Sequence, residues 1–276
     1  GNACAVLVML EVAVLFSSVV ARYVFRTPLI WSDEVASMLF LWLAMLGSVV
    51  ALRRGQHMRM TTVISKAPAA WRPFLETLAV AAAFAFLAMI AFPSYEYAVE
   101  ELHITTPALE IANTWRASAL PIGTGLMLLA SVMRLARMDH WRAGICAIVV
   151  VALVTAIFWQ FGPILEQLGK VNLVIFFLAL LGTTVLAGVP IAFCFGLATF
   201  GYLSLTTYVP LVVVVGRMDE GMSHLLLLAV PMFVFLGVLL EATGMARAMI
   251  VFLASLLGHA RGGLSYVLVG AMYLVS

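Results

Sequence analysis

Long apolar runs separated by short polar connections constrain this chain more than any other feature of its sequence. A helix needs about 20 apolar residues to cross the hydrocarbon core of a bilayer. Backbone polar groups in lipid must be hydrogen-bonded internally, so runs of this length are expected to be helices. The expected spans are residues 3–21, 34–52, 74–95, 115–136, 143–161, 171–188, 190–206 and 224–242. The sequence therefore predicts an all-α integral membrane protein with a multi-span helical bundle.

The composition excludes several classes of protein. Hydrophobic residues make up 64% of the 276 residues and charged residues 10%, whereas soluble domains are about half apolar and about a quarter charged. The net charge of +2 is too balanced for a polyanion binder. The sequence contains no glycine fingerprint for a dinucleotide, no phosphate loop and no H-E-x-x-H motif. Its three cysteines fit neither a disulfide framework nor a zinc site. An enzyme, a metal site and a nucleic-acid reader are therefore not expected.

Three remaining segments are too short or too polar to be spans. Residues 210–222 are short and carry Arg217, Asp219 and Glu220. Residues 245–257 would cover only about 20 Å at 1.5 Å per residue, so an interfacial helix is expected there. Residues 262–276 begin as a membrane segment and stop soon afterwards. Together with a first residue that is not methionine, this ending leads us to expect a piece of a longer permease.

The distribution of positive charge predicts the orientation. If every expected span is real, one side holds ten Lys and Arg and the other holds five, among them Arg116 and Arg217. The first side comprises loops 53–72, 134–142 and 244–261. An excess of Lys and Arg in short loops is typical of the cytoplasmic side. We therefore expect a cytoplasmic N-terminus and an external loop 95–115.

Glu11 is the one carboxylate deep in an expected span, about 12 Å from either end at 1.5 Å per residue. An intramembrane carboxylate indicates a functional role or a buried partner. Two interpretations stay open: a place on an ion pathway, and a protonated or hydrogen-bonded acid at a subunit interface.

The first half contains two motifs, RYVFRTPLIWSDE at 22–34 and ALRRGQHMRM at 51–60, with a span between them. Together they resemble the small membrane subunit of the TRAP transporters, the tripartite ATP-independent periplasmic transporters. The residues that carry this resemblance are Arg22, Trp31, Glu34, Arg53, Arg54 and His57. Around Trp31 and Glu34 we expect anchoring and capping of the second helix, with Ser32 or Asp33 as the cap. For Arg53, Arg54, Arg59 and His57 we expect a topology signal and contacts with lipid headgroups. Arg22 is expected either to reach the headgroups or to pair with Asp33 and Glu34.

The second half resembles the beginning of the large membrane subunit of the same family. GVPIAFCFGLATFGYL at 188–203 matches one of its regions, and the run 225–276 matches what precedes its first re-entrant hairpin tip. The approach to that hairpin is expected to comprise Pro231, Gly258, Gly262 and Gly263. Ser276 would then lie directly before the tip, near a sodium site.

The resemblance implies a domain organisation and a mechanism. Residues 1–140 would be a four-span small-subunit part, 141–170 a linking transmembrane helix, and 171–276 the N-terminal part of the large permease domain. The implied fold is an elevator-type transporter scaffold in the bacterial inner membrane, in contact with lipids. The implied activity is uptake of a carboxylate delivered by a periplasmic binding protein, with sodium as the coupling ion and no other cofactor.

Two questions stay open at this stage. The acidic residues of the external loop, Glu96, Glu100, Glu101 and Glu110, form either a docking surface for the binding protein or an ordinary solvated loop. The alternatives to a TRAP permease are a stand-alone sodium/dicarboxylate symporter and a structural membrane anchor. The symporter would lack the first 140 residues, and the anchor would need haem-ligating histidines inside spans.

Overall fold

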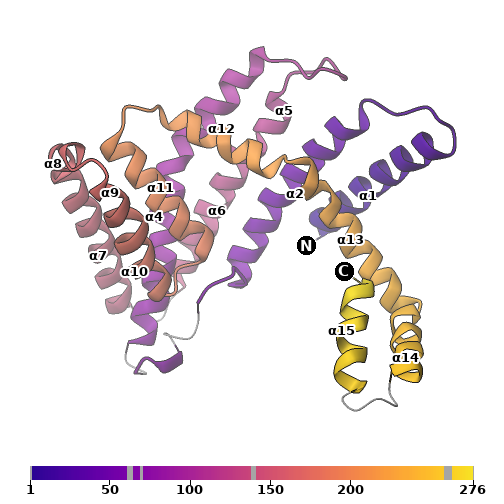
Figure 1. The fold of residues 1–276 in the computed structure, drawn as a ribbon. Helices are drawn as coiled ribbons and strands as arrows, with labels where there is room; N and C mark the ends of the chain where they lie inside the picture. The colour runs from indigo at the N-terminus through magenta and orange to yellow at the C-terminus, as the bar shows by residue number, and fades with distance from the viewer. Residues whose placement is uncertain (1, 61–64, 69–70, 138–140, 258–262, 276) are drawn as a thin grey trace.

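The computed structural model describes residues 2–60, 65–68, 71–137, 141–257 and 263–275. Its first half contains α1 (Asn2–Tyr23), α2 (Ser32–Arg54), α4 (Arg72–Glu100), the 3-10 helix η1 (Glu101–His103), α5 (Thr114–Ala117) and α6 (Ala119–Ala136) (Figure 1). Four helical stretches in the described residues are long and apolar enough to cross a membrane: Asn2–Tyr23, Ser32–Arg54, Arg72–His103 and Thr114–Ala136. The first four expected spans are therefore confirmed.

The second half consists of shorter helices. They are α7 (Trp141–Gln160), α8 (Gly162–Gln167), α9 (Val171–Leu173), the π-helix η2 (Val174–Leu180), α10 (Leu181–Leu186), α11 (Ile191–Thr206), α12 (Leu211–Met222), α13 (Leu225–Ala242), α14 (Met245–Leu257) and α15 (Gly263–Val275). Together with the first half, they make an all-α membrane protein.

Two expected spans are shorter in the structure than the sequence suggested, whereas α7 (Trp141–Gln160) has the length expected for 143–161. In place of 171–188 and 190–206, the apolar helices are Val171–Leu186 and Ile191–Thr206. Both fall below the roughly 20 residues that cross a hydrocarbon core. Gly188 (φ 81°) and Pro190, the N-cap residue of α11, explain these boundaries. A left-handed glycine ends a helix readily, and the residue before a proline is disfavoured in helical conformation.

The centre of the bundle is α4, which packs against α6, α7, α11 and α12. The apolar core joins both halves of the chain around Phe86, whose ring centroid lies 6.0 Å from that of Phe193 and 5.7 Å from that of Phe200. Gly196 permits this contact, because a Cβ at this position would collide with the Phe86 ring. Small residues at helix interfaces allow such close packing within membranes.

The last three helices leave this bundle. α12 and α13 form a pair bent by 42° at a short break. α13 packs against α1 and α2, and α14 packs against α13 and α15. Figure 1 shows α14 and α15 side by side, away from α4 and α6. Gly244 (φ 73°) forms the turn between α13 and α14. A helix at 245–257 is confirmed by α14, and its placement at a membrane interface stays a prediction.

Candidate functional site

Glu34 fastens the connection between η1 and α5 to the start of α2. Its two carboxylate oxygens accept hydrogen bonds from the backbone N–H groups of Ala108 (2.7 Å) and Leu109 (3.0 Å). Nearby, the hydroxyls of Ser18 and Ser32 are hydrogen-bonded at 2.8 Å, which joins the end of α1 to the start of α2. Glu34 is therefore an anchor for the loop, with two charge-assisted bonds.

The expected capping of α2 is wrong. The N-cap residue is Trp31, 41% exposed, and no side chain caps the helix. Ser32 instead donates to the carbonyl of Leu29 at 2.7 Å and pairs with Ser18. Arg22 is exposed at the end of α1. In the part of the chain that the structure describes, it makes no ion pair with the acids of the α2 start.

The Arg-Arg-Gly-x-His motif ends α2 and then contacts α11. Arg53 and Arg54 are exposed in the last turn, where positive charge suits the helix dipole. Gly55 (φ 67°) closes the helix in the left-handed region. The carbonyl of Met58 accepts a hydrogen bond from the backbone N–H of Ile191 at 3.1 Å. The motif thus lies at a junction between the two halves of the chain.

His57 is half-buried at this junction. Its Nε2 lies 3.1 Å from the carbonyl oxygen of Ser48, and its ring meets Phe193 edge-on with centroids 5.3 Å apart. Burial lowers the pKa of His57; the bond to Ser48 opposes this shift, and the charge of Arg134 adds to it. A neutral imidazole that donates from Nε2 satisfies this geometry. His57 therefore supports the contact between α2 and α11, and its contact with lipid headgroups stays a prediction.

A buried polar cluster joins the halves at the opposite end. Asp219 of α12 is 1% exposed. Its Oδ2 lies 2.6 Å from Nη2 of Arg116 in α5 and accepts a hydrogen bond from the Tyr97 hydroxyl of α4 at 2.8 Å. Its Oδ1 accepts a bond from Ser223 at 3.3 Å. Sequence reasoning missed this cluster and treated Arg116 and Asp219 as separate loop charges.

These bonds agree with the expected pairing of loops at each end of the bundle. Arg116 and α12 share one end, as predicted for Arg116 and Arg217. At the other end Arg134 donates to the carbonyl of Leu52 at 3.2 Å, which joins the loops after α2 and α6. Which end faces the cytoplasm stays a prediction.

Glu11 lies in α1 with its side chain completely buried, at 0% exposure. Within the described residues neither of its carboxylate oxygens has a hydrogen-bond partner. Burial of an unpaired carboxylate is costly, so the position calls for a further partner or a functional role. The structure leaves both interpretations of Glu11 open.

The residues expected on the approach to the hairpin are only partly described. Pro231 is buried inside α13, and the break that bends the α12–α13 pair precedes it. Gly263 is buried at the start of α15. Gly258, Gly262 and Ser276 lie outside the described residues. The hairpin therefore stays a prediction.

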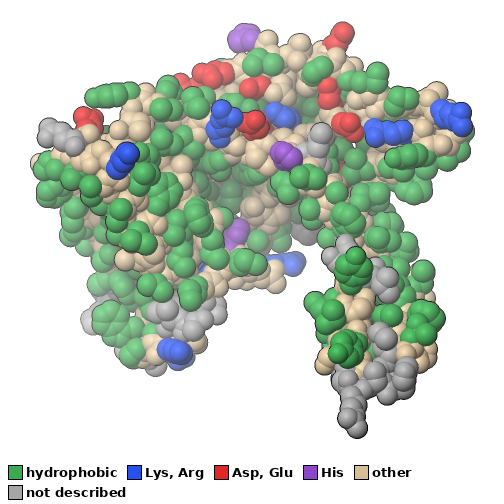
Figure 2. Space-filling view, in the orientation of Figure 1, with side chains coloured by type: hydrophobic (Ala, Val, Ile, Leu, Met, Phe, Trp, Pro, Cys, Tyr) green, Lys and Arg blue, Asp and Glu red, His purple; other side chains and the backbone are tan. Residues whose placement is uncertain are grey.

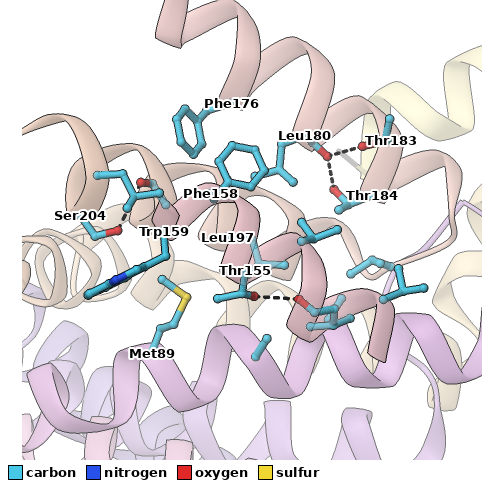
Figure 3. A pocket seen from close by; sticks show the side chains of 18 of the residues that line it. Met89, Thr155, Phe158, Trp159, Phe176, Leu180, Thr183, Thr184, Leu197 and Ser204 are labelled. Atoms are coloured by element: carbon cyan, nitrogen blue, oxygen red, sulfur yellow. Dashed lines mark hydrogen bonds between the residues drawn. The ribbon is translucent and has the colours of Figure 1, made fainter. Parts of the chain in front are cut away.

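A large cavity lies between α4, α7, α10 and α11, with a volume of about 540 Å³ (Figure 3). Its lining is mostly apolar, and its hydroxyl groups already bond to backbone carbonyls. Thr155 donates to Val151 at 2.9 Å, Thr184 to Leu180 at 2.8 Å, and Ser204 to Gly201 at 3.2 Å. A mostly apolar lining without a charged side chain suits a hydrocarbon and not a carboxylate, so we do not assign it as a substrate site. Among the described residues, no group of His, Cys, Asp and Glu side chains has the arrangement of a metal site.

These features define a multi-pass helical membrane protein whose first half forms polar anchors with its second half. The family model for the "DctQ component" of the tripartite ATP-independent periplasmic transporters matches residues 11–140, and the model for the "DctM component" matches residues 174–276. The chain belongs to this family of transporters, not enzymes, and combines small-subunit and large-subunit parts.

Relatives support the same assignment. The chain is 26% identical to the sialic acid TRAP transporter permease protein SiaT of Haemophilus influenzae, over 95% of this chain and 44% of the relative. It is 23% identical to the isethionate TRAP transporter permease protein DctMQ of Oleidesulfovibrio alaskensis, over 87% of this chain and 38% of the relative. It is 35% identical to the C4-dicarboxylate TRAP transporter large permease protein DctM of Rhodobacter capsulatus, over 31% of this chain and 19% of the relative. The chain thus spans less than half the length of these relatives.

Proposed function

We propose that the chain is the permease component of a sodium-coupled TRAP transporter that takes up a carboxylate delivered by a periplasmic binding protein. The observation that carries the proposal is the match of both subunit models in one chain, at residues 11–140 and 174–276. The names of relatives mention sialic acid, C4-dicarboxylate and isethionate, all of which are organic anions. This range supports an organic anion substrate for the present chain.

The structure supports a static role for the first half in an elevator mechanism. Polar anchors at both ends of the bundle and the aromatic core between them hold α11 and α12 against α2, α4 and α5. The segment between the two family matches contains α7 and α8, which fits a linking helix at 141–170. In this proposal the protein lies in the bacterial inner membrane with its N-terminus in the cytoplasm.

The acidic external loop is the proposed contact for the binding protein. Figure 2 shows acidic side chains along the upper edge of the molecule, near α5 and α12. Glu34 pins the loop, and Glu101 is hydrogen-bonded to Asn113. The remaining exposed acids are Glu96, Glu100 and Glu110, which we term the loop carboxylates. The expected loop 95–115 begins later in the structure, because α4 continues to Glu100; Glu96 and Glu100 therefore lie in the last turns of that helix, beside the loop. Exposed charges of this kind steer protein encounters.

Sodium coupling supplies the energy in this proposal. Each net positive charge that moves inward gains about 2.3 kcal/mol per 100 mV of inside-negative potential. An excess of sodium over the negative charge of the substrate would therefore let the potential drive uptake. The sequence contains no phosphate loop for ATP.

Proteoliposomes with a complete permease that contains this chain test the proposal. Uptake of a radiolabelled organic acid should require external sodium and the cognate binding protein, and an inside-negative potential should increase it. Uptake without the binding protein would favour the stand-alone symporter, although that alternative does not account for the small-subunit match at 11–140. A requirement for internal ATP would contradict both functions.

A further inference from the structure

We propose that Asp219, Arg116 and Tyr97 form a positioning lock that fixes α12 to the small-subunit part and sets the direction in which α13 leaves the scaffold. The three side chains come from α12, α5 and α4. This inference rests on the proposed transport function for its consequence, but its geometry can be tested independently of transport.

The lock has a charged centre with several donors. Oδ2 of Asp219 accepts two hydrogen bonds, from Nη2 of Arg116 at 2.6 Å and from the Tyr97 hydroxyl at 2.8 Å. Bonds between a guanidinium and a carboxylate are among the strong hydrogen bonds in proteins. Asp219 is 1% exposed, so its carboxylate depends on these partners in place of water.

Loss of either charge would leave the other without compensation. Nε of Arg116 is buried and has no hydrogen-bond partner among the described residues. Within those residues the guanidinium forms its ion pair through Nη2, with Asp219. Removal of one member of a buried pair is much more damaging than replacement of both by neutral groups. The pair should therefore behave as a unit in a double-mutant cycle.

The same carboxylate reaches the bend. Its Oδ1 accepts a hydrogen bond from Ser223, directly after α12 and before the break that bends the α12–α13 pair by 42°. On the preceding turn, Gly216 faces the Tyr97 ring, and a Cβ there would lie in ordinary contact with it at 3.4 Å. Asp219 thus links the small-subunit part to the residue at which the helix direction changes.

The same helix offers a matched control. Arg217 and Glu220 form an ion pair of 2.7 Å on α12, with side chains 76% and 68% exposed. This pair has the same chemistry and nearly the same position along the chain, but within the described residues neither side chain forms an ion pair or hydrogen bond with the small-subunit part. Exposed pairs contribute little, because water screens them.

The experiment uses a complete permease with its native cysteines replaced and spin labels at Leu126 of α6 and Phe233 of α13, both of which are exposed. Asp219→Asn and Arg116→Gln should each broaden or shift the distance distribution between the labels. Both should lower the maximal uptake rate about tenfold with little change in the KM for the binding protein. The double variant should be no worse than the more damaging single variant. Glu220→Gln and Arg217→Gln should match the parent protein in both measurements.

An unchanged distance distribution in Asp219→Asn, or equal changes in Glu220→Gln, would overturn the lock. If Asp219→Asn is not recovered in folded form, Tyr97→Phe replaces it, since it removes one hydroxyl and no charge; an unchanged distribution in that variant would also overturn the inference. Absence of transport in the parent protein would contradict the proposed function alone, because the label distances still report on the lock.

Discussion

Gly123 in α6 offers a sharp test of how closely the helices of the small-subunit part pack. A Cβ at this position would lie 2.8 Å from Cβ of Met45 in α2 and 2.6 Å from its Cε. The terminal methyl group can rotate away, but the Cβ of Met45 is fixed to the α2 backbone. Ordinary contact between the added Cβ and Cβ of Met45 begins at 3.4 Å, so α2 and α6 would have to separate by about 0.6 Å to restore it.

A separation of this size has a predictable cost. A gap of about 0.5–1 Å forfeits about a quarter to a half of the dispersion attraction between atoms that were in contact. Overpacking of a well-packed core typically costs about 1–3 kcal/mol. Gly125 lies in the same helix, and a Cβ added there would meet nothing within 4 Å, so Gly125→Ala is the matched control. Both substitutions share the helix preference of Ala over Gly, about 0.5–1 kcal/mol.

The difference between the variants therefore isolates the packing cost. Gly123→Ala should be about 1–3 kcal/mol less stable than Gly125→Ala. The assay is reversible unfolding of the purified protein in mixed micelles, followed by circular dichroism. The reasoning is refuted if the two variants have equal stability, or if Gly123→Ala is the more stable.

Three further predictions concern orientation, docking and pH. In a cysteine-free background, an impermeant thiol reagent should label a cysteine at position 105 but not one at position 66 in intact cells, and labelling at 66 alone would reverse the orientation. Replacement of the loop carboxylates by Gln should slow uptake and weaken its salt dependence, because salt screens exposed charges; unchanged uptake across ionic strengths would reduce the loop to a connector. Because burial lowers the pKa of His57 below its usual 6.5, stability should be lost as the pH falls below about 6.5, where the unfolded chain takes up a proton first. Thermal unfolding measured from pH 7.5 to 5.5 should show a smaller loss of stability for His57→Gln than for the parent protein. An identical loss in the two proteins would rule out His57 as the source of the pH dependence.

The sequence predicted those elements whose signal is local. Four spans follow directly from apolar runs longer than the hydrocarbon core. The ends of the later helices were harder to predict, because apolar content alone does not show where a helix ends. Gly188 and Pro190 end one helix and begin the next within a continuous apolar stretch. There the backbone preferences of glycine and proline decide the boundary, and hydropathy does not.

For the polar contacts between helices and loops, the sequence indicated one residue of each contact but not its partner. Glu34 and His57 were singled out as motif residues, but their partners are backbone groups of Ala108, Leu109 and Ser48. A backbone N–H or C=O has no side-chain signature, so such a partner follows only from the fold. Asp219 was noticed as one charge in a short segment, yet its partner Arg116 lies 103 residues away. One indication of this pairing was present in the sequence, because the charge distribution assigned Arg116 and the segment that contains Asp219 to the same side of the membrane.

The placement of the anchors limits where any moving part can begin. α11 is bonded to the small-subunit part at its first residue, Ile191, and α12 near its end, at Asp219. The aromatic core around Phe86 fills the space between these two points. Packed interiors change by discrete rearrangement and do not deform continuously, so in the proposed elevator mechanism α11 and α12 would belong to the fixed part. A rigid displacement of the moving part would then begin after Asp219, and the break that bends the α12–α13 pair follows Asp219 directly.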